Sequence, residues 1–119
     1  PWGTYWVIDE GDGFQIKRLH INPGHATSYH RHQYQSARWT VVEGLLTAHL
    51  AREVVPLLTN QSVWVPAGMA HRLENETSNV VKVIEIITGS YIGEDDIERM
   101  SDNYGREKTR PASPRGEIF

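Results

Sequence analysis

The sequence of 119 residues contains no cysteine, which excludes a disulfide framework, a cysteine-ligated zinc site and a thiol nucleophile. It has no apolar run approaching the roughly 20 residues of a membrane-spanning helix, and no signal-peptide pattern. Positive charge is not in excess either, because the formal net charge is -3. We therefore expect a cytoplasmic protein that binds neither nucleic acid nor a membrane.

Histidine, by contrast, is abundant, with six residues in this short chain. Any bound metal must be held by imidazole and carboxylate, because thiolate is absent. The length suits one compact domain that buries roughly two-thirds of the surface of its unfolded chain. The chain begins at Pro1 rather than at a methionine, and we expect it to be a trimmed or excised piece.

Most of the chain shows the two-residue period of strands rather than a helical period. Six segments are rich in β-branched and aromatic residues and are separated by turn signals. The segments are residues 4–8, 14–21, 39–42, 45–50, 62–65 and 80–87. Many short strands with regular turns predict an all-β barrel or sandwich.

One helix is predicted near the C-terminus, over Glu94 to Met100, because three acids at its start complement the helix dipole. Residues 105–119 have no apolar period and are expected to be irregular. We accordingly place one domain at residues 1–104 and a tail at 105–119.

Two histidine-bearing stretches carry chemistry. His30 and His32 are two residues apart, so on a strand they point to the same face. About forty residues later, a turn at Pro66 and Gly68 ends one strand and places His71 near the start of the next. Three imidazoles from two hairpins would leave coordination positions open, as a catalytic metal site requires.

These stretches resemble the two motifs of the cupin superfamily. The first motif matches at Gly24, His30, His32 and Gly44, and the second at Pro66, Gly68, His71 and Asn75. Within the cupins, the chain is similar to the type II mannose-6-phosphate isomerases, which often form the C-terminal domain of a bifunctional mannose-1-phosphate guanylyltransferase. Further matching stretches are residues 1–5, 17–18, 39–42, 60–62, 84–85, 93–97 and 104–106.

The resemblance implies a cupin fold, a double-stranded β-helix or jelly-roll barrel, with the short C-terminal helix added. It also implies a homodimer that interconverts mannose 6-phosphate and fructose 6-phosphate for polysaccharide synthesis. The metal ligands would be His30, His32 and His71. The cofactor would be a divalent ion (Zn, Ni, Mn or Fe), which imidazole accepts in each case. The partner would be a small phosphosugar.

The sequence departs from this family at the metal site. His30 stands where the family has a glutamine ligand, and Ala37 stands where it has a carboxylate ligand. A site of three neutral imidazoles should bind metal more weakly and attract anionic ligands more strongly. Glu85, Glu74 and Glu43 are the candidates to replace the missing carboxylate.

Other charged residues are candidates for substrate chemistry. Lys17, Arg18 and Arg72 could hold a phosphate, or could be ordinary strand-surface charges. Glu85 and His49 are the candidates for the catalytic base. Glu85 lies in an otherwise apolar strand, and the sequence leaves open whether it enters the barrel.

Two alternatives to the isomerase stay open because of Ala37. The first is a small-molecule oxygenase, since three-histidine cupins with open positions include Fe(II) dioxygenases. The second is a sugar-binding cupin without catalytic activity. Metal content of the purified protein separates the last alternative from the other two.

Overall fold

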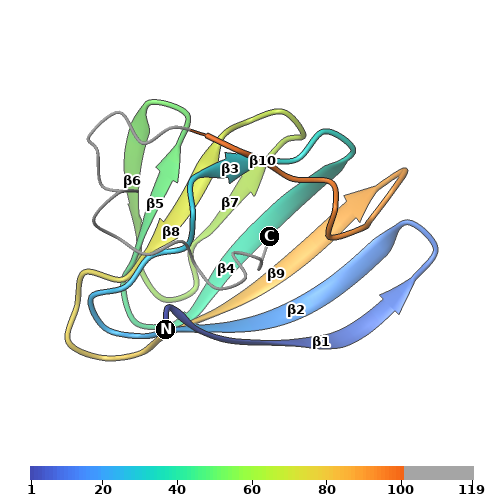
Figure 1. The fold of residues 1–119 in the computed structure, drawn as a ribbon. Coiled ribbons are helices and arrows are strands. Elements are labelled where there is room, and N and C mark those ends of the chain that lie inside the picture. Colours follow the sequence, from blue (N-terminus) through green and yellow to red (C-terminus); the bar gives the residue numbers. More distant parts are fainter. Residues whose placement is uncertain (101–119) are drawn as a thin grey trace.

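The computed structural model describes residues 1–100, which form ten strands (Figure 1). The strands are β1 Gly3–Gly11, β2 Phe14–Ile21, β3 His30–Arg31, β4 Gln35–Glu43, β5 Leu46–Leu50, β6 Glu53–Leu57, β7 Ser62–Val65, β8 His71–Glu74, β9 Val81–Gly89 and β10 Glu98–Arg99. No helix in this described part is long and apolar enough to cross a membrane. The expected all-β architecture is confirmed.

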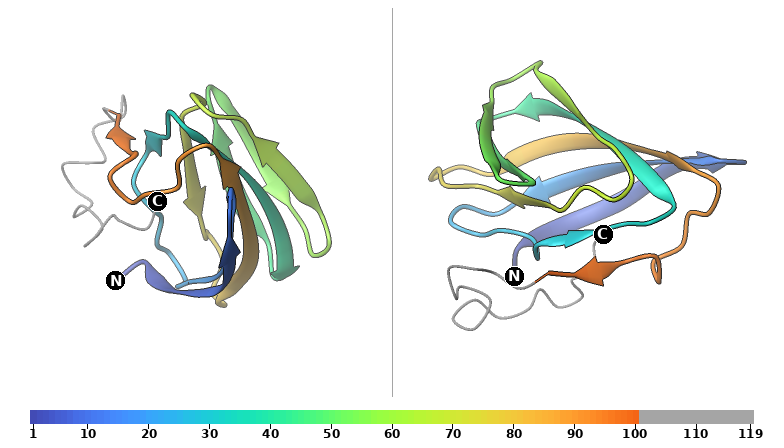
Figure 2. Two further views of the ribbon diagram at one scale, coloured as in Figure 1. Left: turned by 90° about the vertical axis from the view of Figure 1, so that its right-hand side faces the viewer. Right: turned by 90° about the horizontal axis from the view of Figure 1, so that it is seen from above.

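The strands make two five-stranded antiparallel sheets that face each other, as Figure 2 shows. One sheet has the order β1-β2-β9-β4-β7 and contains the long strands; the other has the order β10-β3-β8-β5-β6. Neighbouring strands within each sheet are often far apart in the sequence. Because no short turn joins such strands, the burial of one face of each strand sets their register.

The core lies between the two sheets, and the long strands contribute alternate residues to it. In β4 and β9 the buried residues alternate with more exposed ones, so that Trp39, Val41 and Val83 point inward. Leu46 and Leu73 reach the same core from the second sheet. Burial of these side chains contributes roughly 1.5 to 3 kcal/mol each relative to exposure.

The six predicted strands are all present, but four others were missed. β3 and β10 have only two residues each, and β8 consists of His71–Glu74, which carries no β-branched residue. β6 contains Pro56, which is tolerated because this strand is at the edge of its sheet. Local propensity could not identify these strands, since tertiary pairing defines them.

The predicted helix over Glu94 to Met100 is wrong. The segment forms a turn and then β10, whose Glu98 pairs in register with Arg31 of β3 and accepts a 2.8 Å bond from its guanidinium. The Asp96 carboxylate accepts backbone N–H bonds from residues 33 and 34. These long-range partners outweigh a helix of two turns, which would be marginal by itself. The predicted tail over 105–119 and the domain limit at 104 lie outside the described residues.

Candidate metal centre

The three motif histidines come together at one end of the second sheet. His30 in β3 is the register partner of His71 in β8, and His32 follows directly after β3. Their ring centroids are 4.6 Å apart for His30 and His71, 5.0 Å for His30 and His32, and 5.3 Å for His32 and His71. All three side chains are buried. We call this group the histidine cluster.

The ligand atoms of the histidine cluster are close enough to share one ion. One nitrogen from each ring lies within 4.8 Å of the other two. Nitrogen atoms about 2.1 Å from a common metal would be separated by roughly 3 to 4 Å. The rings therefore need only a small adjustment to bind an ion, and the donor set suits a divalent transition metal.

Each imidazole is oriented by a bond to its Nδ1 atom. The hydroxyl of Ser28 lies 2.9 Å from Nδ1 of His30. Nδ1 of His32 bonds the backbone carbonyl of Asp96, and Nδ1 of His71 bonds that of Met69 at 3.0 Å. A carbonyl only accepts, so in His32 and His71 the proton is on Nδ1. The lone pair of a neutral ring then lies on Nε2, which is the usual arrangement of metal-ligating histidines.

Burial also keeps these imidazoles in the neutral form that binds metal. Desolvation lowers the pKa of His71 to about 3. Desolvation is the main cause that lowers the pKa of His30 well below its ordinary value, and electrostatic repulsion from His71 and His32 adds to it. The pKa of His32 is lowered by desolvation too. At neutral pH the cluster therefore presents three unprotonated nitrogens and does not have to release protons to bind a cation.

One turn connects the two histidine-bearing stretches. The backbone N–H of Gly68 donates to the carbonyl of His32 at 2.7 Å. Gly68 has a φ of +89°, a conformation that glycine adopts without strain. The next residue, Met69, supplies the carbonyl that orients His71. The glycine of the second motif therefore sets the position of both stretches.

Two supporting residues were not identified from the sequence. Ser28 has no motif signal, because a serine beside a strand is common in any protein. Asp96 was assigned to the start of a helix, whereas its carboxylate and carbonyl hold the loop that carries His32. Its signal was present only as one acid among several in the segment 93–98.

Beside the histidine cluster, three residues form a row across the first sheet. In the pairing of β2, β9 and β4, Glu85 is the register partner of both Lys17 and Trp39. All three are buried and point to the inner face. The indole N–H of Trp39 donates to Oε2 of Glu85 at 2.9 Å. The Lys17 ammonium lies 4.8 Å from the centroid of the Tyr5 ring.

Glu85 enters the barrel, which answers the question that the sequence left open. Burial raises the pKa of its carboxyl to about 7, and the nearby Lys17 charge and the Trp39 hydrogen bond oppose that rise. Its other oxygen, Oε1, is buried without a hydrogen-bond partner among residues 1–100. The carboxyl is thus poised to exchange a proton near neutral pH.

No carboxylate joins the histidine cluster in the described part of the chain. Ala37 is buried on the inner face of β4, in register with Val65 and Ile87, where it offers only a methyl group. Glu43 is at the surface near Lys82. The departure noted in the sequence therefore persists in the structure, and the donor set is three imidazoles.

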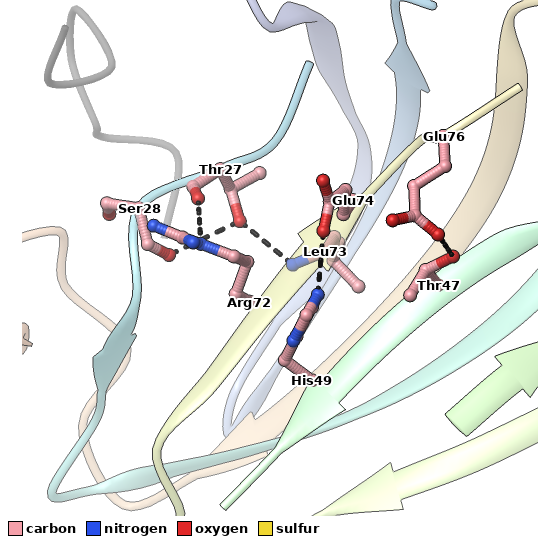
Figure 3. Close-up of polar contacts among 8 residues, drawn as sticks. All are labelled: Thr27, Ser28, Thr47, His49, Arg72, Leu73, Glu74 and Glu76. Carbon is pink, nitrogen blue, oxygen red and sulfur yellow. Dashed lines mark hydrogen bonds and ion pairs between the residues drawn. The ribbon is translucent and has the colours of Figure 1, made fainter. Parts of the chain in front are cut away.

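His49 and Arg72 lie on the opposite face of the second sheet from the histidine cluster. They are register partners, and Arg72 directly follows His71, so its side chain points the other way. Figure 3 shows this outer group, in which His49 Nε2 is 2.8 Å from Glu74 and Arg72 donates to the Thr27 carbonyl at 3.0 Å. The structure therefore does not bring His49, Arg72 or Glu74 to the cluster.

Arg18 is likewise directed away from the cluster. It is exposed on the outer face of β2, and its guanidinium lies 4.4 Å from the centroid of the Trp6 ring. Lys17, the neighbouring residue, points inward. Among the candidate phosphate-binding residues, only Lys17 faces the interior that the histidines share.

The chain matches the family model described as mannose-6-phosphate isomerase C-terminal over residues 1–102. It is 43% identical over 106 residues to xanthan biosynthesis protein XanB of Xanthomonas campestris, which covers 89% of this chain and 23% of XanB. It is 40% identical over 112 residues to alginate biosynthesis protein AlgA of Pseudomonas syringae, which covers 94% of this chain and 23% of AlgA. The chain thus spans less than a quarter of these relatives.

Solved structures establish the fold as a cupin. A Klebsiella pneumoniae protein with a double-stranded β-helix domain superposes with a TM-score of 0.73 at 18% identity, covering 84% of this chain and 85% of that one. A cupin domain of an Enterobacter cloacae transcriptional regulator gives 0.69 at 20% identity, covering 78% of this chain and all of that one. The expected cupin barrel is confirmed.

Proposed function

This chain belongs to the mannose-6-phosphate isomerase C-terminal family, and from that premise we propose that it is a metal-dependent isomerase of mannose 6-phosphate and fructose 6-phosphate. The observation that carries the proposal is the histidine cluster, whose rings are buried, neutral and oriented through Nδ1. Relatives named for xanthan and alginate biosynthesis support a role in polysaccharide precursor supply.

His30, His32 and His71 would hold the divalent ion through their Nε2 atoms. When bound, such an ion supplies Lewis-acid polarisation of a sugar carbonyl and its neighbouring hydroxyl. Three protein ligands leave positions open for those two oxygens. The buried surroundings limit the number of competing waters and strengthen each electrostatic interaction.

Glu85 is the base that we assign to the proton transfer between C1 and C2. Its pKa of about 7 lies near the working pH, so it can both accept and return a proton. It shares the inner face with Lys17, whose charge also lowers the pKa of His32. Lys17 is therefore the candidate for attracting the substrate phosphate toward the interior.

The absence of a carboxylate at Ala37 fits an anionic substrate. Without an anionic protein ligand, the bound cation keeps its full double charge. This excess charge and Lys17 both favour a phosphosugar over a neutral sugar. The same absence weakens metal binding, so we expect the ion to be lost readily on dialysis against a chelator.

The test is turnover of mannose 6-phosphate to fructose 6-phosphate by protein loaded in turn with Zn, Ni, Mn and Fe(II), with elemental analysis of the loaded protein. We expect turnover with at least one metal, loss of metal and turnover in His71→Ala, and loss of turnover with retained metal in Glu85→Gln. The matched control is Arg18→Ala, which changes an exposed residue on the outer face and should behave as the parent protein. Stoichiometric metal without turnover in every case would overturn the isomerase.

A second function, Fe(II)-dependent oxygenation of a small molecule, is favoured by one observation. The donor set of the described residues is all imidazole, which a non-haem iron oxygenase could use with its remaining positions open. Oxygen consumption by the Fe(II)-loaded protein with candidate substrates separates this function from the isomerase, which consumes no oxygen.

We also propose that the protein is a homodimer, with the long edge strand β1 as the contact. This strand has nine residues, and Trp6, Val7 and Ile8 are exposed on it. Edge strands of this length usually need cover. Light scattering of the parent protein and of a Val7→Lys variant tests the proposal, which fails if both are monomers.

A further inference from the structure

We propose that Trp39 is a positioning residue that holds Glu85 at a fixed place relative to the histidine cluster, leaving Oε1 as the oxygen that exchanges the proton. The inference rests on the proposed isomerase only for its kinetic consequence. The positioning itself is a property of the folded chain and can be measured without turnover.

The Trp39 indole contacts both Glu85 and the histidine cluster. The Trp39 N–H donates to Oε2 of Glu85 at 2.9 Å. The Trp39 ring also packs edge-to-face on His71, with centroids 5.3 Å apart and an interplanar angle of 66°. One rigid side chain with two rotatable bonds therefore contacts the carboxyl and a cluster histidine at the same time.

Core filling alone does not account for a tryptophan here. Trp39 is fully buried, and its partners in the core are mostly aliphatic, among them Val41 and Val83. A phenylalanine would supply a ring for the same contact with His71. What only tryptophan adds is the N–H, and this donor is directed at a carboxyl group that is itself fully buried.

The hydrogen bond divides the two oxygens of Glu85 between two tasks. Oε2 is occupied by the indole, while Oε1 has no hydrogen-bond partner among the described residues. A donor to one oxygen stabilises the carboxylate form, which makes it easier for Oε1 to release its proton. It also fixes the direction in which Oε1 points, as proton transfer in a substrate complex requires.

Few charged groups face Glu85, so the effect of the indole can be isolated. Lys17 on β2 is the ionisable register neighbour on one side, and Trp39 on β4 is on the other. Tyr5 of β1 lies against Lys17. From the second sheet, the inner-face residues Leu46 and Leu73 are apolar, and the ionisable groups there are the histidines of the cluster.

The experiment is the Trp39→Phe variant, which keeps a ring but removes the donor. The titration of the Glu85 carboxyl is followed by infrared difference spectroscopy in metal-free protein, with Glu85→Gln used to assign the band. We expect the midpoint to rise by about one pKa unit or more, because a hydrogen bond to a charged group is lost. The exposed Trp64→Phe variant is the matched control and should leave the midpoint unchanged.

In the metal-loaded protein the acid limb of kcat/KM should shift upward by the same amount, and the double variant Trp39→Phe/Glu85→Gln should lack turnover, as Glu85→Gln alone does. An unchanged or lowered midpoint in a folded Trp39→Phe protein would overturn the positioning role. If the midpoint rises but no variant, nor the parent, isomerises mannose 6-phosphate, the proposed function fails while the positioning of Glu85 by Trp39 stands.

Discussion

Replacing Glu85 with glutamine should stabilise the metal-free protein at alkaline pH. Glu85 is fully buried, and burial raises the pKa of its carboxyl from 4.5 to about 7. At about 1.36 kcal/mol per pKa unit, ionising this group costs the folded state about 3 kcal/mol more than the unfolded state. Glutamine has nearly the same shape and keeps an oxygen for the Trp39 N–H, but it never ionises.

The sign follows from proton binding. The folded state holds the Glu85 proton more tightly, so the favourable contribution of the neutral carboxyl is fully present below pH 4.5 and is lost as the pH rises through about 7. The advantage of Glu85→Gln over the parent protein should therefore grow by about 2.5 kcal/mol between about pH 5 and about pH 8.

Urea unfolding at a series of pH values, in the presence of a chelator, measures this difference directly. Comparing the two proteins at each pH cancels the titration of the histidines, which both contain. A difference in unfolding free energy that stays constant across this range, or that shrinks toward alkaline pH, would refute the reasoning. It would mean that water solvates the Glu85 carboxylate, or that the Lys17 charge fully offsets the cost of burying it.

Three further predictions concern metal affinity and the stability of the fold. Ser28→Ala removes the hydroxyl that bonds Nδ1 of His30; metal affinity should fall roughly 10-fold, as measured by competition with a chromophoric chelator. Gly89→Ala would place a methyl carbon 2.2 Å from the Tyr34 carbonyl oxygen, so the unfolding free energy should fall by about 1 to 3 kcal/mol, and a loss of less than half that would contradict the close approach. Burial lowers the pKa values of the three histidines of the cluster. The unfolding free energy of the metal-free Glu85→Gln variant, measured by urea unfolding, should therefore decrease as the pH falls below about 6.5. An unfolding free energy that rises with acidification would contradict this.

Much of the fold and the centre of the site could be predicted from the chain alone. The alternation of apolar residues in 14–21 and 80–87 identified two long strands, because one buried face imposes a two-residue period. The spacing of His30, His32 and His71 indicated a shared site, since the motifs place these histidines on neighbouring strands. That the three rings do lie together is a property of the pairing of β3 with β8.

The failures share one physical cause, which is that long-range partners decided the outcome. Residues 94–100 have the acidic start of a helix, yet the carboxylate of Asp96 bonds a loop more than sixty residues away in sequence. A local sequence pattern contains no information about a partner so far away in the chain.

For this protein, the sequence by itself determined the β-rich architecture through its two-residue period. It also determined the family and the three clustered imidazoles, because its motifs resemble those of a known family. It also revealed the missing carboxylate at Ala37. Only the tertiary structure decided which charged residues share the interior with the cluster. Lys17 and Glu85 face it, whereas Arg18 and His49 do not. Side chains of adjacent residues point to opposite faces of a strand, and only the packing of the two sheets establishes which face is inside.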